Sequence, residues 1–372
     1  MTAKASLSDY QNRLSRLEQT MVQRGIQTAV FSPGPDLRYL VGYDAKPLER
    51  LTALVVRPGK PSVVISPFLE KEAALASPIG ELNLEVLTWN ETDDPFAIVV
   101  SLAGGAGTVA VDGRMWADKL LKIQNAGPAI ETVSANPLIA ELRMRKTKDE
   151  VEALRRAGEA IDWVHSLVPT VLKVGRTEAE VGKDIAALII ESGHVTADFI
   201  IVGSGPNSAS PHHEVSDRVI QLGDAVVVDI GGTMPDGYCS DSTRTYHMGP
   251  ATESYLKKYA TLLEAQLIAT QAVKPGVACE SIDAAGRTVM NRDGIGELFF
   301  HRIGHGIGLE THEDPYMVEG NSLPLEAGMA FSIEPGFYIT GDAGARIEDI
   351  VVCGEDGPIV LNNRPRELVI LD

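Results

Sequence analysis

The chain places acidic residues inside apolar segments that look like buried strands. Asp229 directly follows the apolar run 225–228, and Glu334 follows Phe331 and Ile333. An ionised carboxylate in such a setting costs several kcal/mol unless it is paired or bound to a cation. The sequence therefore predicts a fold that brings positive partners to these acids, and metal ions meet that requirement.

Five residues between positions 229 and 348 lie in segments that suit metal ligands. Oxygen and neutral nitrogen ligands match divalent manganese, cobalt, zinc or iron better than thiolate-preferring ions. Paired metals that activate water are typical of hydrolases. The candidate ligands are Asp229, Asp241, His305, Glu334 and Glu348.

Taken alone, these candidates have simpler interpretations. Asp229 suits a cap or turn after a strand. Asp241 suits an ion pair with Arg244, and Glu348 suits the same role with Arg346, as many surface acids do. The presence of all five residues in this order favours the metal site.

Four further histidines lie near the candidate ligands. His301 and His312 flank His305 in the sequence, whereas His212 and His213 end a loop-like segment rich in glycine, serine and proline. Imidazole beside an activated water can donate to a developing oxyanion. We expect one member of the 212–213 pair to be only a polar loop residue.

Length and composition limit the classes of protein to which the chain can belong. A chain of 372 residues favours two domains. Its 33 basic and 51 acidic residues give a net charge of −18, so we expect no binding to nucleic acid or anionic membrane. Residues 1–6 contain no apolar signal core, the apolar stretch 97–111 is broken by glycines, and the three cysteines form no CxxC pair. These features predict a cytoplasmic protein with reduced thiols and no transmembrane helix.

The periodicity of apolar residues predicts two α/β regions. In the first, helices are expected near 7–21, 67–76 and 115–123, and strands near 28–31, 51–56, 62–66 and 108–111. A basic connector near 142–148 separates domains 1–142 and 143–372. Capping boxes at Thr147 with Glu150 and at Thr177 with Glu180 predict two helix starts in the second domain. Further helices near 253–273 and 280–291 precede a strand-rich end.

The segments around the candidate ligands resemble those of the Xaa-Pro peptidase group, which comprises prolidase and aminopeptidase P. The matching segments are 228–231, 238–245, 301–312, 333–336 and 346–349. The resemblance implies a small creatinase-like N-terminal α/β domain and a C-terminal pita-bread α+β catalytic domain. Methionine aminopeptidases lack the large N-terminal domain, and creatinases lack the ligand set.

The resemblance also implies roles for individual residues. Asp241, His305 and Glu348, with Glu334, would hold one divalent metal, and Asp229, Asp241 and Glu348 would hold a second, with manganese the expected ion. Glu334 would orient the attacking water and move its proton. His212 and His312 would stabilise the tetrahedral intermediate and help the leaving nitrogen. His301 would line the proline pocket, Arg346 would support the carboxylates, and Tyr238 would contact substrate. Members of this group are commonly homodimers.

One departure from the group leaves the substrate length open. Strict dipeptidases often carry an arginine between the second histidine and the Glu-Pro-Gly segment, to grip the proline carboxylate. Here 313–333 contain no lysine or arginine, and Tyr316 stands in that region. Another loop, Arg38 or a partner subunit would have to supply the clamp, or longer Xaa-Pro peptides would be accepted. The alternatives are an enzyme of the same fold that acts on a non-peptide metabolite, and a catalytically silent binding homologue.

Overall fold

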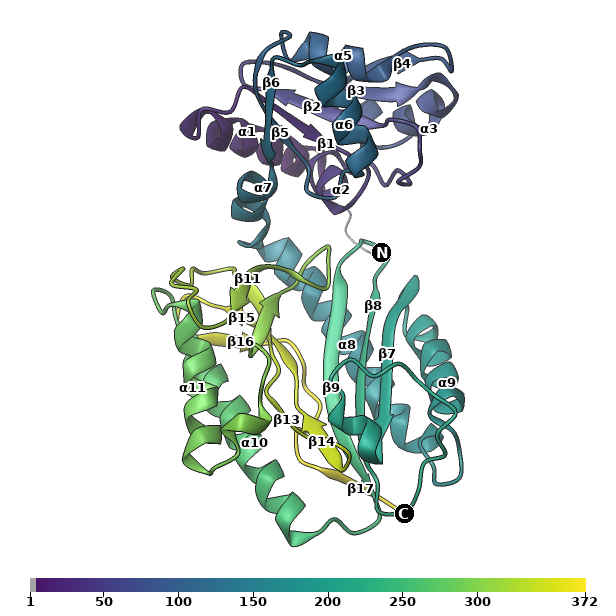
Figure 1. Ribbon diagram of the computed structural model, residues 1–372, viewed down its shortest axis with the longest axis vertical. Helices are drawn as coiled ribbons and strands as arrows, with labels where there is room; N and C mark the ends of the chain where they lie inside the picture. Colours follow the sequence, from purple (N-terminus) through teal and green to yellow (C-terminus); the bar gives the residue numbers. More distant parts are fainter. Residues whose placement is uncertain (1–4) are drawn as a thin grey trace. The chain divides into compact units, whose positions relative to one another are not determined.

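The computed structural model describes residues 5–372 and divides between Arg143 and Met144 into two compact units (Figure 1). Each unit has its own sheets and its own hydrophobic core. Within residues 5–372, no helix combines the length and apolarity needed to cross a membrane.

The N-terminal unit is built around one mixed sheet in the strand order β4-β3-β2-β1-β5-β6. Its β-branched inner positions, such as Val30, Val55 and Val109, pack with Val99 and Ile123 from two covering helices. The strands are β1 (Thr28–Phe31), β2 (Ala53–Arg57), β3 (Lys60–Pro67), β4 (Glu85–Trp89), β5 (Gly107–Val111) and β6 (Ile130–Ser134). The helices are α1 (Leu7–Gln23), α2 (Pro35–Val41), η1 (Phe68–Glu70), α3 (Lys71–Leu75), α4 (Pro78–Glu81), α5 (Pro95–Leu102), α6 (Ala117–Ala126) and α7 (Asn136–Arg143).

The single helix expected near 67–76 is wrong in its start. Strand β3 continues to Pro67, and a 3-10 turn, η1, precedes the short α3. Residues 63–67 pair in parallel with β4, so the sheet ladder extends further than the apolar pattern indicated.

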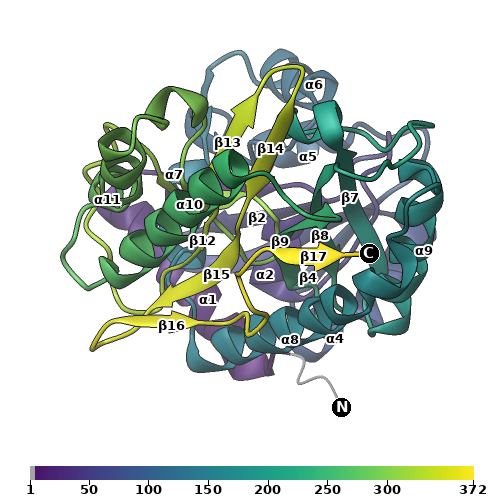
Figure 2. The same cartoon turned by 90° about the horizontal axis from the view of Figure 1, so that it is seen from below.

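The C-terminal unit places its sheets between two pairs of helices (Figures 1 and 2). The first pair is α8 (Lys148–Val171) with α9 (Glu178–Glu191), and the second is α10 (Glu253–Gln271) with α11 (Cys279–Arg292). The predicted capping boxes are confirmed, because the Thr147 and Thr177 hydroxyls accept from the backbone of Glu150 and Glu180, and both glutamates accept in return. Such caps contribute about 1 kcal/mol each.

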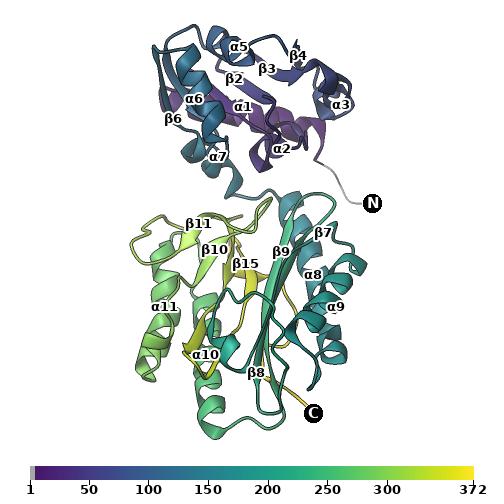
Figure 3. The ribbon, with the colours of Figure 1, turned by 45° about the vertical axis from the view of Figure 1, so that its right-hand side comes forward.

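Two sheets, seen in Figure 3, and a hairpin, labelled in Figure 1, lie between these helix pairs. One sheet has the order β17-β9-β8-β7, the other has the order β11-β10-β12-β15-β16, and β13 pairs with β14. The first sheet's strands are β7 (Thr196–Ser204), β8 (Ala225–Thr233), β9 (Cys239–Met248) and β17 (Val369–Leu371). The others are β10 (Gly304–Gly306), β11 (Glu313–Met317), β12 (Ala330–Ile333), β13 (Gly336–Ile339), β14 (Ala343–Arg346), β15 (Asp349–Cys353) and β16 (Pro358–Val360), with 3-10 turns η2 (Gly205–Ala209) and η3 (Gly296–Leu298).

The alternation of side chains along β8 places the core residues on one face of the strand and the candidate ligand Asp229 on the other. Val226, Val228 and Ile230 join the apolar cluster formed with α8 and α9. Side chains alternate along a strand, so Asp229 must project from the opposite face. The buried acid of the apolar run therefore faces away from the helices, toward Arg346 of the β13–β14 hairpin.

Candidate metal centre

The five predicted ligands come from five segments of the C-terminal unit and line one open pocket of about 1020 Å³. Asp229 and Asp241 lie on the neighbouring antiparallel strands β8 and β9. His305 lies on β10, Glu334 follows β12, and Glu348 precedes β15. The structure thus brings together side chains that are up to 119 positions apart, from 229 to 348, in the sequence.

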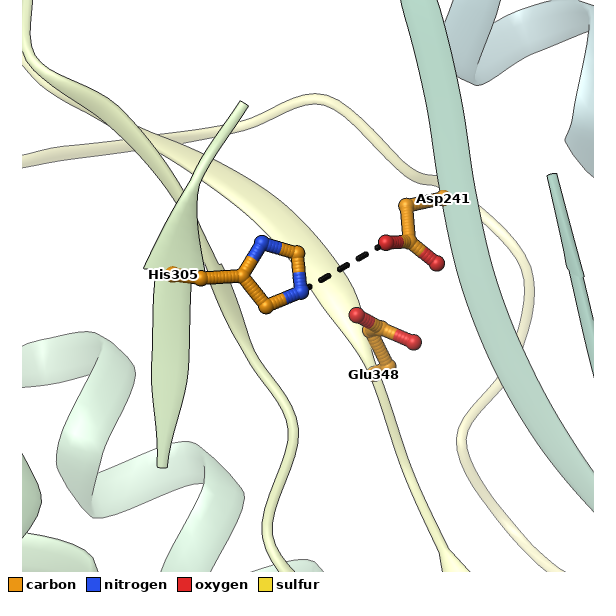
Figure 4. Close-up of side chains that lie close together, drawn as sticks. All are labelled: Asp241, His305 and Glu348. Atoms are coloured by element: carbon orange, nitrogen blue, oxygen red, sulfur yellow. Dashed lines mark ion pairs between the residues drawn. The ribbon is translucent and has the colours of Figure 1, made fainter. Parts of the chain in front are cut away.

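Three of these residues form a compact group that could hold a metal ion. Asp241, His305 and Glu348 each offer a ligand atom, and these atoms lie within 4.8 Å of one another. Figure 4 shows the three side chains pointing toward a common point, with His305 Nε2 3.6 Å from Asp241 Oδ2. All three residues are buried. Two oxygen donors and one imidazole nitrogen suit a borderline or hard divalent cation.

Glycines on both sides of His305 allow the strands around it to approach closely. A Cβ atom on Gly304 would lie 1.9 Å from the Ser332 carbonyl oxygen, and one on Gly306 would lie 2.3 Å from the Asp314 carbonyl oxygen. The Ser332 hydroxyl accepts from the His305 amide at 3.1 Å. The glycines therefore fix the His305 backbone between β11 and β12.

Asp229 has one oxygen satisfied and one oxygen without a protein partner. Arg346 forms an ion pair with Asp229 Oδ2, whereas Oδ1 is buried and has no hydrogen-bond partner in residues 5–372. A buried carboxylate oxygen without a donor is costly, which points to a cation at that position. The donor set and this orphaned oxygen fit a second metal ion that involves Asp229.

The remaining acids are held close together. Glu334 Oε1 lies 3.2 Å from His305 Nε2, and Glu348 Oε2 accepts from the Thr243 hydroxyl at 2.7 Å. Burial, followed by the charge of neighbouring carboxylates, raises the pKa of Asp241 and of Glu348 well above their usual values. Burial also opposes ionisation of Glu334, but the hydrogen bond and charge of His305 outweigh it and lower its pKa to about 2. A bound cation would relieve the crowding of negative charge.

The predicted histidines lie in the same pocket but make different contacts. His312 stacks obliquely on His305, with ring centroids 4.0 Å apart. Enclosure by the pocket and the neighbouring His305 lower the pKa of His312, so its ring is neutral at neutral pH. Both His212 and His213 line the pocket; His212 is exposed, and His213 Nε2 lies 2.7 Å from Glu178.

Tyr338 is a site residue that the sequence analysis missed. Arg346 Nη1 donates to its hydroxyl oxygen at 2.8 Å, so the hydroxyl proton is free to donate to His301 Nε2 at 3.0 Å. His301 Nδ1 then donates to the Arg302 carbonyl at 2.7 Å. A chain of contacts therefore joins Asp229, through Arg346 and Tyr338, to His301.

The structure corrects the prediction that Tyr238 contacts substrate. Tyr238 is buried beside Leu154 and Ile307, outside the pocket lining, and its hydroxyl donates to Glu150 at 2.8 Å. Tyr238 lies just before β9 and belongs to the same apolar cluster as Cys239, the first residue of that strand. Pocket residues that were not predicted include Phe199, Ile200, Phe300, Arg302 and Thr311.

Replacing Asp241 by asparagine should raise the stability of the metal-free protein but remove its stabilisation by metal. In the presence of chelator, Asp241→Asn should stabilise the protein by roughly 1–3 kcal/mol, because it removes one of the crowded charges. Added Mn²⁺ should stabilise the parent by about 2.7 kcal/mol at a concentration 100 times the Kd, but should not stabilise the variant. Urea unfolding measures both effects, with the exposed Asp356→Asn as control. Equal stabilisation of parent and variant by Mn²⁺ would contradict a ligand role for Asp241.

Comparisons with known proteins agree with this geometry. Residues 152–355 match the model of metallopeptidase family M24, and residues 13–145 match that of the creatinase/prolidase N-terminal domain. The chain is 47% identical to the probable dipeptidase PepE of Mycobacterium tuberculosis, over 97% of this chain and 96% of that protein. It is 34% identical to the Xaa-Pro dipeptidase of Lactobacillus helveticus, over 96% of this chain and 98% of that protein.

Solved structures show the same architecture. The crystal structure of dipeptidase PepE from Mycobacterium ulcerans matches with a TM-score of 0.95 and 47% identity, covering 99% of this chain and all of that one. The recombinant prolidase from Thermococcus sibiricus matches with a TM-score of 0.91 and 36% identity, covering 98% and 99% of the two chains. The expected two-domain fold and the resemblance to the Xaa-Pro peptidase group are confirmed. The chain belongs to metallopeptidase family M24, with a creatinase/prolidase N-terminal domain ahead of its pita-bread catalytic domain.

Proposed function

We propose that this chain hydrolyses the peptide bond before proline in Xaa-Pro dipeptides, with two divalent metal ions per subunit. The observation that carries the proposal is the convergence of four carboxylates and His305 on one pocket, with Asp229 Oδ1 left unsatisfied. The named activity of the Lactobacillus helveticus relative supports the choice of Xaa-Pro substrates.

The five candidate ligands comprise the tight group of Asp241, His305 and Glu348 and two further acids, Glu334 and Asp229. Asp241, His305 and Glu348, with Glu334, would hold one ion, and Asp229 would hold the other together with Asp241 and Glu348. Bound metals of this type polarise the scissile carbonyl and make water a better nucleophile at neutral pH. Arg346 keeps Asp229 oriented through its Oδ2 atom, which leaves Oδ1 available.

The other pocket residues have separate tasks in the proposed reaction. Glu334 accepts the proton of the attacking water and returns it to the departing proline nitrogen. That nitrogen carries no hydrogen in the substrate, so it must gain one to leave as a secondary amine. The neutral ring of His312 and the exposed ring of His212 donate hydrogen bonds to the developing oxyanion. His301 is committed at both ring nitrogens, so its role is to form a wall beside the proline ring.

Arg302 supplies the cation that the 313–333 segment lacks. Its guanidinium carbon lies 4.5 Å from the centroid of the Tyr316 ring, and the residue lines the pocket beside His301. No carboxylate among residues 5–372 forms an ion pair with it, so its charge is available to a ligand. A guanidinium at this position fits the free carboxylate of a dipeptide.

Other features extend the proposal and rest on the family resemblance. They are manganese as the bound ion, a homodimeric assembly and a cytoplasmic location. The division of the chain into domains 1–142 and 143–372 is supported by the separation of the two compact units after Arg143.

Removing metal should abolish Xaa-Pro hydrolysis. We expect Ala-Pro and Met-Pro cleavage to disappear after exhaustive chelation and to return with Mn²⁺ or Co²⁺, measured by release of free proline. Full activity after chelation would contradict the proposal. Cleavage confined to non-peptide metabolites in a substrate panel would favour the alternative enzyme.

Glu334→Gln should lower kcat at least about 100-fold, because proton transfer of this kind contributes 10² or more.

Arg302→Met should raise KM for a dipeptide but not for a peptide whose C-terminal carboxylate is blocked as an amide. The variant keeps an unbranched, flexible stem but loses the charged guanidinium, so KM for Ala-Pro should rise about tenfold or more. KM for Ala-Pro-amide, which lacks the carboxylate, should change little. Arg292→Met, at an exposed arginine on α11, is the matched control. Equal increases of KM for the two substrates would contradict the carboxylate clamp.

A further inference from the structure

We infer that Glu178 is a positioning residue, which fixes the 204–216 loop so that His212 faces the reacting carbonyl. The 204–216 loop joins the end of β7 to the segment before β8 and contains the 3-10 turn η2. This inference rests on the proposed function of His212. It concerns a carboxylate that is neither among the candidate metal ligands nor among the residues that line the pocket.

Glu178 binds the loop at several points through both carboxylate oxygens. Its Oε1 accepts from the Ser204 amide at 2.7 Å and from the Ser204 hydroxyl at 2.6 Å. Its Oε2 accepts from Ser216 at 2.6 Å and from His213 Nε2 at 2.7 Å, and Asn207 Nδ2 lies 3.1 Å from both oxygens. The residue has no exposed surface, so these donors replace water entirely.

The carboxylate is held in its charged form. Burial opposes ionisation, but the hydrogen bonds from Ser204, Ser216 and His213 outweigh it and lower the pKa of Glu178. Glu178 is also the first residue of α9, where the helix dipole favours a negative charge. Arg218 reinforces this side of the loop, since it contacts the Ser204 hydroxyl at 2.5 Å and Asp224 at 2.6 Å.

The two adjacent histidines of the loop therefore have different tasks. His213 donates through Nε2 to Glu178, and its side chain is 16% exposed. His212 is exposed to the pocket, and no hydrogen bond or ion pair of its side chain occurs among residues 5–372. The direction of the His212 ring thus depends on the backbone that its neighbour anchors.

A second set of contacts holds the opposite side of the loop against the metal centre. Arg346 Nη2 donates to the Pro211 carbonyl at 3.1 Å, and the Gly344 amide donates to the Ser208 hydroxyl at 2.8 Å. Arg346 is also the partner of Asp229. His212 is consequently fixed between the Glu178 contacts and the group that orients a metal ligand.

Glu178 also lies at the start of a helix, so the test must distinguish the positioning of His212 from a purely structural role in that helix. Glu178→Gln keeps the shape of the side chain, but its amide nitrogen cannot accept the hydrogen bonds that one oxygen accepts now. Glu180→Gln is the matched control, because Glu180 is exposed on the same helical turn and accepts from the Thr177 amide, not from the loop. His213→Ala removes the histidine contact to Glu178, together with a side chain that lines the pocket, and serves as a second probe if Glu178→Gln fails to fold.

The test is a double-mutant cycle with His212→Ala, assayed on Ala-Pro with Mn²⁺ present. Glu178→Gln and His213→Ala should each lower kcat about tenfold, as expected for loss of a charge-assisted hydrogen bond, with KM changed by less than about twofold. In the His212→Ala background the same changes should lower kcat by less than about twofold, because residues that act through one another are not additive. Glu180→Gln should match the parent.

Hydrogen exchange supplies a readout that does not depend on activity. Backbone amides of the 204–216 loop should exchange about tenfold faster in Glu178→Gln than in the parent or in Glu180→Gln. Unchanged exchange, or undiminished loss of kcat in the His212→Ala background, would overturn the inference. If the parent cleaves no Xaa-Pro peptide, the proposed function fails, whereas the exchange experiment still decides whether Glu178 fixes the loop.

Discussion

The burial of several carboxylates in one pocket is the constraint on which the catalytic unit depends. Asp229, Asp241, Glu334 and Glu348 lie together with few protein cations, and burial raises the pKa of three of them. Such an arrangement is unfavourable for the protein alone and favourable once divalent ions are bound. The glycines around His305 and the contacts of Arg346 are explained by the need to hold these groups in one place.

Arg346 connects this constraint to the rest of the pocket. Its guanidinium contacts Asp229, Tyr338, Thr243 and the Pro211 carbonyl. A single buried cation therefore orients a candidate metal ligand, the wall formed by His301 and the loop that carries His212. Arginine suits this task because its donors are arranged in a rigid plane.

Asp229, Glu334 and His305 could be singled out from the sequence because each stands where local pattern and chemistry disagree. Asp241 and Glu348 were candidates only together with the other three. An acid after four apolar residues, as at Asp229, or an imidazole between glycines, as at His305, is unusual for a simple core strand. Alternation in β8 then explains why Val228 and Ile230 could enter a core while Asp229 did not. The role of Tyr238 was implied only by the family resemblance, and its burial beside Leu154 and Ile307 is a tertiary contact that the sequence does not show.

Other site residues depend on contacts that local patterns do not encode. Tyr338 meets Arg346 because β13 pairs with β14, and Glu178 meets His213 because α9 packs beside the end of β7. Arg302 is one position from a predicted histidine, yet its availability follows only from its placement over Tyr316. These are tertiary relations between segments, so a single sequence gives no period or spacing from which to read them.

Anomalous diffraction from crystals grown with Mn²⁺ would show directly whether the buried carboxylates hold metal ions. We expect two manganese peaks about 3.5–4 Å apart, with Asp241 and Glu348 contacting both ions and Asp229 Oδ1 contacting one. Arg346 should remain on Asp229 Oδ2. A single peak that leaves Asp229 Oδ1 without a metal, or no peak in the pocket at saturating Mn²⁺, would show that these acids do not form a two-metal site.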